Sequence, residues 1–209
     1  MKVLLVNGSP HRTGCTYTAL SEVAKALNEA GVDTTHFHIG RRAISGCIAC
    51  DCCVETGDCA LGGTVREFTD LAAEYDGFVI GSPVYYSGMN GSLKSFLDRA
   101  FYSAARENSP FRLKPAAAVV SARRAGTTST FDEINKYFFI SQMIVVPSCY
   151  WNMVHGRTPE EVRQDEEGMQ IMRTLGRNMA YLLRLKEAGT KAGVALPEQE
   201  KRVYTNFIR

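Results

Sequence analysis

The stretch that decides the fold of this chain reads Asn7-Gly8-Ser9-Pro10-His11-Arg12-Thr13-Gly14-Cys15-Thr16-Tyr17-Thr18. It follows the apolar run Val3-Leu4-Leu5-Val6 and precedes a segment with helical periodicity. Glycines and hydroxyls between a strand and a helix form a pocket for an anion, because the first N–H groups of the helix have no intrahelical partner and carry the positive end of its dipole. The hydroxyls of Ser9, Thr16 and Thr18 suit a phosphate group, and Arg12 adds a positive charge.

Two common nucleotide-binding motifs are absent from the sequence. It contains no G-x-x-x-x-G-K-[ST], which argues against a P-loop, and no G-x-G-x-x-G, which argues against a dinucleotide-binding turn. A hydroxyl-rich loop of this kind fits the phosphate of flavin mononucleotide (FMN). An ordinary strand-to-helix turn is the alternative interpretation of the loop by itself.

Length and composition restrict the class of protein. The chain has 209 residues with 45% hydrophobic and 22% charged residues, which predicts one α/β domain, residues 1–189, with a C-terminal tail, residues 190–209. A net charge of +2 from scattered residues gives no electrostatic reason to expect nucleic acid. No apolar run is long enough to span a bilayer, so we expect no membrane partner. Because the sequence opens directly into a strand, we expect a cytoplasmic protein.

Strand-like and helix-like segments alternate along the chain. Five alternating strands predict a doubly wound parallel sheet in the order 2-1-3-4-5. The predicted strands span residues 2–6, 33–39, 77–81, 115–120 and 143–146. The direction of winding changes between the first and third strands, and ligands bind at the carboxyl ends of the strands around such a point. We therefore expect a ligand near three loops, at residues 8–16, 82–91 and 121–128.

The second and third of these loops contain residues suited to a flat heterocycle. Pro83 and the neighbouring glycines fix an irregular backbone, while Tyr85 and Tyr86 offer aromatic faces. In the third loop, Arg123 and Arg124 can stabilise negative charge on a reduced flavin. Paired arginines also occur on solvated surfaces, so that alternative stays open.

Three motifs give the chain a resemblance to a known family. The S-P-H-R-x-G-x-T loop, the G-S-P-V-Y loop and the stretch Lys94-Ser95-Phe96-Leu97-Asp98-Arg99 resemble the flavodoxin-fold NAD(P)H-dependent FMN reductases, a group that includes the iron–sulfur flavoproteins. The resemblance covers roughly the first 130 residues. It implies a flavodoxin-like fold, bound FMN, NAD(P)H as co-substrate, and homodimers or homotetramers.

The resemblance also implies a set of cofactor-binding residues. The phosphate would be held by Ser9, Arg12, Cys15, Thr16 and Thr18. The ring would be flanked by Pro83, Val84, Tyr85, Tyr86 and Ser87. Its pyrimidine end would meet Ser121, Ala122, Arg123, Arg124 and Gly126. Many members have asparagine where this chain has Cys15, so only the backbone contact of that residue carries over.

Four cysteines form the pattern Cys47-x-x-Cys50-x-x-Cys53-x5-Cys59, with Cys52 beside them. Three thiolates at intervals of three can converge on a [4Fe–4S] cluster, and a fourth nearby completes its coordination. This spacing resembles that of the iron–sulfur flavoproteins. A zinc site is a second interpretation, although zinc sites usually pair two separate knuckles. A third is that these cysteines bind no metal and pack as small apolar residues.

These features predict an FMN-dependent oxidoreductase. Electrons from NAD(P)H would pass through FMN to a small-molecule acceptor such as a quinone or another flavin. Because the flavin carries the chemistry, we expect no catalytic acid–base residue. One alternative is an electron carrier in which FMN and a cluster exchange single electrons with a ferredoxin-like donor. Another is a flavin-binding regulatory module that senses redox state through its thiols.

Overall fold

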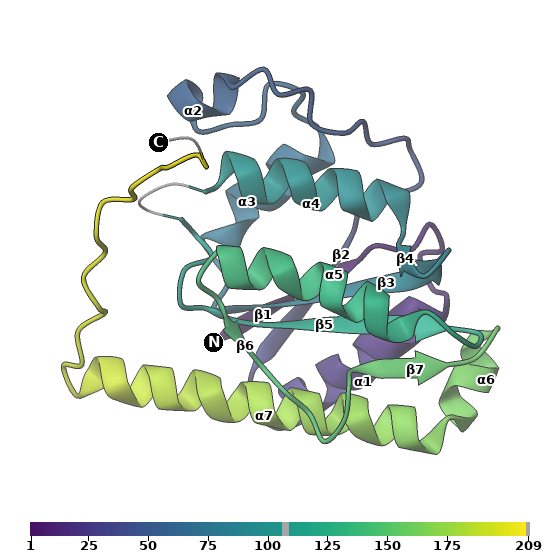
Figure 1. Ribbon diagram of the computed structural model, residues 1–209. Coiled ribbons are helices and arrows are strands. Elements are labelled where there is room, and N and C mark those ends of the chain that lie inside the picture. The colour runs from purple at the N-terminus through teal and green to yellow at the C-terminus, as the bar shows by residue number, and fades with distance from the viewer. Residues whose placement is uncertain (106–108, 208–209) are drawn as a thin grey trace.

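Five parallel strands form the central sheet in the order β2-β1-β3-β5-β6 (Figure 1). The computed structural model describes residues 1–105 and 109–207. The core strands are β1 (Lys2–Asn7), β2 (Asp33–His38), β3 (Gly77–Tyr85), β5 (Pro115–Ala122) and β6 (Ile144–Val145). Since β5 and β6 are the fourth and fifth core strands along the chain, the predicted order 2-1-3-4-5 is confirmed.

Two short strands extend this sheet. The strand β4 (Gly88–Met89) pairs antiparallel with the end of β3, and β7 (Met153–His155) pairs parallel with the end of β5. The edge position next to β5 is thus shared, because β6 pairs with its first residues and β7 with its last. Pro147, which follows the predicted strand 143–146, has no N–H with which to continue the ladder.

Helices cover both faces of the sheet (Figure 1). They are α1 (Cys15–Glu29), α2 (Cys52–Thr56), α3 (Thr64–Ala72), α4 (Gly91–Ser103), α5 (Thr127–Ile140), α6 (Pro159–Gln164) and α7 (Glu166–Lys191). One core lies between the sheet and α3, α4 and α5, and the other between the sheet and α1, α6 and α7. No helix in the described part of the chain is long and apolar enough to cross a membrane.

Side chains that alternate between the two faces of each strand contribute to both cores. In β1, Leu4 and Val6 pack on the side of α3, whereas Val3 and Leu5 pack on the side of α1. Alternate side chains of a strand point to opposite faces, so a strand that is apolar throughout is covered on both. The strand therefore leads directly from the buried sheet into the loop that follows Asn7.

The C-terminal segment leaves the domain surface after α7. Its backbone runs past the ends of the sheet toward α2, and its side chains are mostly exposed (Figure 1). The guanidinium of Arg112 donates a 2.9 Å hydrogen bond to the carbonyl of Pro197. The predicted boundary at residue 189 falls inside α7, two residues before its end. Residues 208–209 of the predicted tail lie outside the described residues.

Candidate functional site

The three loops predicted to form the site meet at the carboxyl end of the sheet. The Gly8 N–H donates a 2.9 Å hydrogen bond to the carbonyl of Gly81, joining the residue after β1 to the middle of β3, directly before the second loop. The hydroxyls of Thr16 and Ser121 lie 2.8 Å apart, joining the first loop to the third. A Cβ at Gly126 would lie only 2.8 Å from the Cα of Ser87, so the second and third loops also touch.

The first loop is organised by a residue that sequence reasoning missed. The buried amide of Asn7 accepts a 3.0 Å hydrogen bond from the Ser9 N–H and donates to the carbonyls of His11 and Arg12. The ring nitrogen Nε2 of His38 lies 2.8 Å from the carbonyl of Ser9. An asparagine at the end of a strand often folds the following turn in this way, and this was the available signal for Asn7.

The start of α1 leaves backbone donors available for an anion. Gly14 occupies the N-cap position, and no side chain caps the helix. The N–H groups of the first turn are therefore open to a ligand. Arg12 is exposed beside them. It lines a hollow of about 520 Å³ together with Gly14, Arg41 and Arg157. A phosphate fits this combination of open N–H groups and positive charge.

The predicted phosphate ligands occupy different surroundings. The hydroxyl of Thr18 donates back to the carbonyl of Gly14 at 3.2 Å, and that of Thr16 is directed to Ser121. The Ser9 hydroxyl accepts a hydrogen bond from the His11 N–H. Burial raises the pKa of the Cys15 thiol, so this residue offers its backbone N–H rather than a thiolate. Their roles toward a phosphate stay predictions.

The second loop is a tight hairpin between β3 and β4. Tyr85 pairs with Gly88, so Tyr86 and Ser87 are the two turn residues, and their φ angles are 50° and 59°. Two successive positive φ angles define the mirror-image hairpin turn that usually contains Asn-Gly, and non-glycine residues adopt them at a cost. The turn exposes the side chains of both tyrosines. Pro83 and Val84 are half-buried beneath it.

The third loop follows β5. Ser121 and Ala122 are buried at the end of the strand, whereas Arg123 and Arg124 are exposed. Gly126 has a φ of +90° and is the N-cap residue of α5. The loop therefore brings two cations and several backbone N–H groups to the edge of the site formed by the other two loops.

The segment that holds the four cysteines, residues 47–59, is called the cysteine loop below. It lies on another side of the domain, over α4 (Figure 1). All four predicted cluster ligands line one small cavity, which Arg99 and Tyr102 of α4 close: Cys47, Cys50, Cys53 and Cys59. Burial, followed by the neighbouring sulfurs, raises the pKa of the Cys53 thiol. Within the described residues, no three His, Cys, Asp or Glu side chains already stand at metal-binding distances. The four residues border one cavity, and their thiols are the type and number of donors that a [4Fe–4S] cluster uses.

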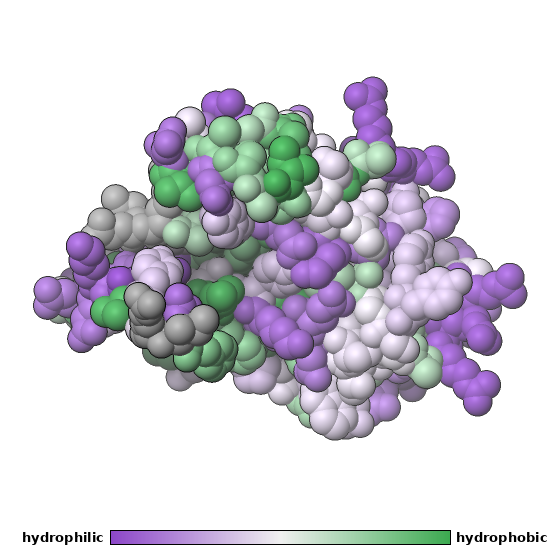
Figure 2. Space-filling view, turned by 45° about the horizontal axis from the view of Figure 1, so that its top comes forward, coloured by the Kyte–Doolittle hydropathy of each residue, from purple (hydrophilic) through white to green (hydrophobic). Residues whose placement is uncertain are grey.

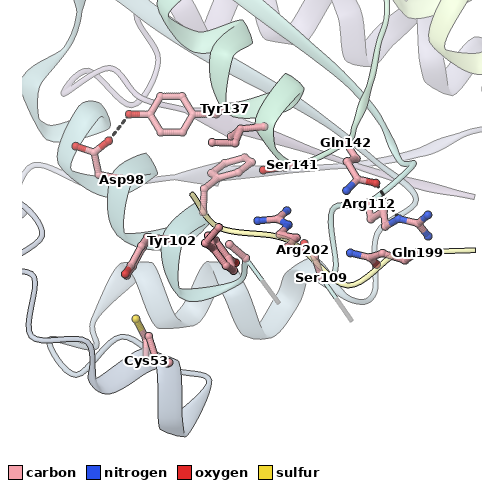
Figure 3. Close-up of a pocket in the computed structure, with 15 residues that line it drawn as sticks. Cys53, Asp98, Tyr102, Ser109, Arg112, Tyr137, Ser141, Gln142, Gln199 and Arg202 are labelled. Atoms are coloured by element: carbon pink, nitrogen blue, oxygen red, sulfur yellow. Dashed lines mark hydrogen bonds between the residues drawn. The ribbon is translucent and has the colours of Figure 1, made fainter. Parts of the chain in front are cut away.

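Exposed apolar side chains surround this loop. Ile48, Val54 and Tyr102 are more than half exposed. Hydrophobic surface gathers on this side of the molecule (Figure 2). Next to it lies a hollow of about 590 Å³ between α4, α5 and the C-terminal segment (Figure 3). The loop is therefore bordered by exposed apolar surface.

A polar triad lies beside the hollow, and two of its three members, Asp98 and Tyr137, line it. The hydroxyl of Tyr137 donates to the carboxylate of Asp98 (Figure 3). The amine of Lys94 lies 2.8 Å from that carboxylate and 2.6 Å from the hydroxyl. Burial, and then the hydrogen bond to Asp98, raises the pKa of Tyr137 to about 12. The phenol therefore stays protonated at neutral pH and ties α5 to α4.

Comparison with known proteins shows the family to which the chain belongs. Residues 1–158 match the family described as NADPH-dependent FMN reductase. The chain belongs to the NADPH-dependent FMN reductase family, as the resemblance of its motifs predicted. Its function is accordingly that of a flavin-dependent oxidoreductase.

Within that family the chain matches the iron–sulfur flavoproteins. One from Methanocaldococcus jannaschii is 30% identical over 190 residues, and the match covers 88% of this chain and 98% of that protein. Another, from Archaeoglobus fulgidus, is 28% identical over 193 residues, covering 87% and 97%. These two matches therefore extend over most of the chain, well beyond the three loops.

Solved structures confirm the flavodoxin-like fold. A flavodoxin from the domain Archaea has a TM-score of 0.59 at 14% identity, covering 88% of this chain and 99% of its own. RosB, solved with a riboflavin phosphate derivative bound, has a TM-score of 0.71 at 14% identity, covering 99% and 92%.

Proposed function

We propose that this protein transfers electrons between FMN, bound where the three loops meet, and a [4Fe–4S] cluster in the cysteine loop. The contact between Thr16 and Ser121 carries the flavin part, because it places the start of α1 against the loop after β5. The shared cavity of the four cysteines supports the cluster part, as do the names of the relatives.

The residues of the flavin site would have separate tasks. The open N–H groups of α1 and the charge of Arg12 would hold the phosphate. The hairpin at Tyr86 would place an aromatic face and backbone groups beside the ring. Arg123 and Arg124 would stabilise negative charge at the pyrimidine end. When bound, FMN supplies a ring that exchanges one or two electrons, so the protein needs only to orient it and exclude competing reactions.

A second candidate function is the oxidation of NADPH or NADH by the bound flavin, with a quinone, another flavin or a similar small molecule as acceptor. The family description favours it. The hairpin side of the site leaves Tyr85 and Tyr86 exposed, which is compatible with a nicotinamide approaching the ring from solvent. In the first candidate, a ferredoxin-like donor would replace the nicotinamide.

Anaerobic purification tests both candidates. The expected sample contains one FMN per chain, iron and acid-labile sulfide in a ratio typical of a cubane, and broad visible absorbance. Anaerobic addition of NADPH or NADH then separates them. Rapid bleaching of the flavin supports the second candidate, whereas bleaching only by reduced ferredoxin or dithionite supports the first. Protein that takes up no FMN contradicts both.

We also propose that the chain forms a homodimer or homotetramer. The rings of Tyr150 and Trp151 contact each other with centroids 4.5 Å apart, and both side chains are about half exposed. They border a hollow with Phe139, which is also exposed. Exposed aromatic clusters of this kind are typical of subunit contacts. Sedimentation equilibrium showing only monomer at micromolar concentration would contradict the proposal.

A further inference from the structure

Arg99 is a buried cation with no carboxylate partner in the described part of the chain. It lies on α4 and is only 5% exposed. The ion pairs that the described residues form do not include it. A guanidinium removed from water without an anion is costly, so such residues normally have a charged partner. The hydrogen-bond partners of Arg99 therefore indicate which anion would balance its charge.

The hydrogen bonds that the Arg99 guanidinium donates in the described part of the chain all run to residues 45–62, the segment that holds the four cysteines. Its Nε donates to the sulfur of Cys59 at 3.2 Å. Its Nη2 donates to the carbonyl of Gly62 at 2.9 Å, and its Nη1 donates to the carbonyl of Ser45 at 3.4 Å. These two carbonyls flank the whole segment that holds the four cysteines. One side chain thus joins both ends of the loop to α4 and touches one of its sulfurs.

The protonation state of the Cys59 sulfur decides whether its hydrogen bond with Arg99 is favourable. A neutral thiol is a weak acceptor and provides no charge for a buried guanidinium. A sulfur that ligates iron is anionic and accepts a charge-assisted hydrogen bond. The same contacts are therefore unfavourable around free thiols and favourable around a thiolate-bound cluster.

We propose that Arg99 is the counter-ion and positioning residue of the cluster, and that it raises the cluster's reduction potential. This inference rests on the cluster part of the proposed function. Reduction adds negative charge to the cluster, and a buried cation that donates to a ligand sulfur stabilises the added charge. The flavin loops are not involved, because Arg99 lies about 12 Å along α4 from Gly91 at the helix start.

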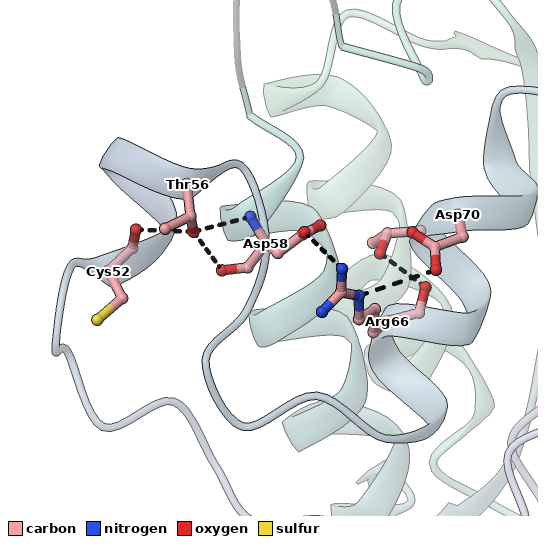
Figure 4. Close-up of polar contacts among 6 residues, drawn as sticks. Cys52, Thr56, Asp58, Arg66 and Asp70 are labelled. Atoms are coloured by element: carbon pink, nitrogen blue, oxygen red, sulfur yellow. Dashed lines mark hydrogen bonds and ion pairs between the residues drawn. The ribbon is translucent and has the colours of Figure 1, made fainter.

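Arg66 provides a matched control. It lies on α3 beside the same loop and pairs with Asp58, the neighbour of Cys59, at 3.1 Å and with Asp70 at 4.0 Å (Figure 4). The Arg66 side chain is 57% exposed. Replacing Arg66 removes the same charge near the same cysteine. This charge is exposed to water and already paired with two carboxylates.

The experiment compares the wild-type protein with R99Q, R99K and R66Q, each purified anaerobically and reconstituted with iron and sulfide. Iron, sulfide and FMN per chain are measured, followed by a potential titration of the cluster monitored by electron paramagnetic resonance. In R99Q, the ratio of reduced to oxidised cluster at the wild-type midpoint is expected to fall about tenfold, which corresponds to about 59 mV for one electron. R99K keeps the charge, so the same ratio is expected to fall less in that variant. In R66Q the ratio is expected to change less than about twofold, because water screens an exposed charge. FMN per chain is expected to stay constant.

A cluster in R99Q that titrates like the wild type would overturn the inference. If R99Q retains FMN but binds no iron, R99K decides: iron uptake by R99K supports the counter-ion role, and its failure shows that the shape of the guanidinium alone matters and overturns that role. A wild-type protein with FMN but no iron overturns the cluster part of the proposed function, and this inference with it. A wild-type protein without FMN contradicts the flavin part instead.

Discussion

The side-chain oxygens of Thr16 and Ser121 lie 2.8 Å apart, although 105 positions separate the two residues along the chain. Both are buried, one in the first turn of α1 and the other at the end of β5. The hydrogen bond fixes the distance between the predicted phosphate loop and the predicted pyrimidine-end loop. A flavin bound across both loops would meet them at the separation that this hydrogen bond sets.

We expect T16V and S121A to weaken FMN binding, and the double variant to bind little worse than either single variant. A buried neutral hydrogen bond contributes about 1 kcal/mol, which corresponds to roughly a fivefold change in affinity. The two effects are coupled because each substitution removes the same bond. Fluorescence quenching on titration with FMN measures the three dissociation constants. Fully additive losses would show that the bond does not link the loops.

We expect G126A to lower both stability and FMN affinity. A Cβ there would lie 2.8 Å from the Cα of Ser87 and 2.9 Å from the Cγ1 of Val84, and the backbone φ is +90°. The strain alone costs about 1 kcal/mol, and displacing the hairpin adds to it. G31A is the matched control, because Gly31 also has a positive φ of 75° but a Cβ there would meet no atom within 4 Å. Chemical unfolding and FMN titration of both variants check this. Equal losses in the two would mean that the hairpin contact contributes nothing.

We expect R12Q to weaken binding of FMN but not of riboflavin. The exposed guanidinium of Arg12 stands beside the open N–H groups of α1 and would contact only the phosphate. A charge-assisted contact in partly exposed surroundings contributes about 1 kcal/mol, so the FMN dissociation constant should rise roughly fivefold and depend less on salt. K25Q removes a charge farther along α1 and is the control. A similar loss of riboflavin affinity in R12Q would assign Arg12 to the ring or to folding instead.

The sequence predicted the sheet order and the meeting of three loops because both follow from local patterns. Apolar strands separated by amphipathic helices admit few arrangements, and the change of winding direction places the ends of β1, β3 and β5 together. The contact between Gly126 and Ser87 needed the actual backbone, since neither residue indicates the other.

Other features could not be predicted because they depend on partners distant in sequence. Arg99 follows Asp98 in a helix, and a charged residue would ordinarily be placed at the surface. Its burial depends on a loop that begins more than 50 positions earlier, at Ser45. The support that His38 gives to Ser9 likewise depends on the register of β2 beside β1.

We expect the protein to lose stability between pH 7 and pH 5 partly through His36. Burial lowers the pKa of this imidazole, whose Nδ1 has no hydrogen-bond partner among the described residues and whose ring packs against Tyr17 at 4.7 Å. In the unfolded chain it gains a proton as the pH falls through about 6.5, whereas the folded chain resists protonation until a lower pH. The unfolded state then binds more protons, so acid favours unfolding. Thermal unfolding of H36F should show a smaller decrease in midpoint over this range than the wild type. H11Q, which alters an exposed histidine, should keep the wild-type decrease, and an H36F profile parallel to the wild type would assign the acid sensitivity to other groups.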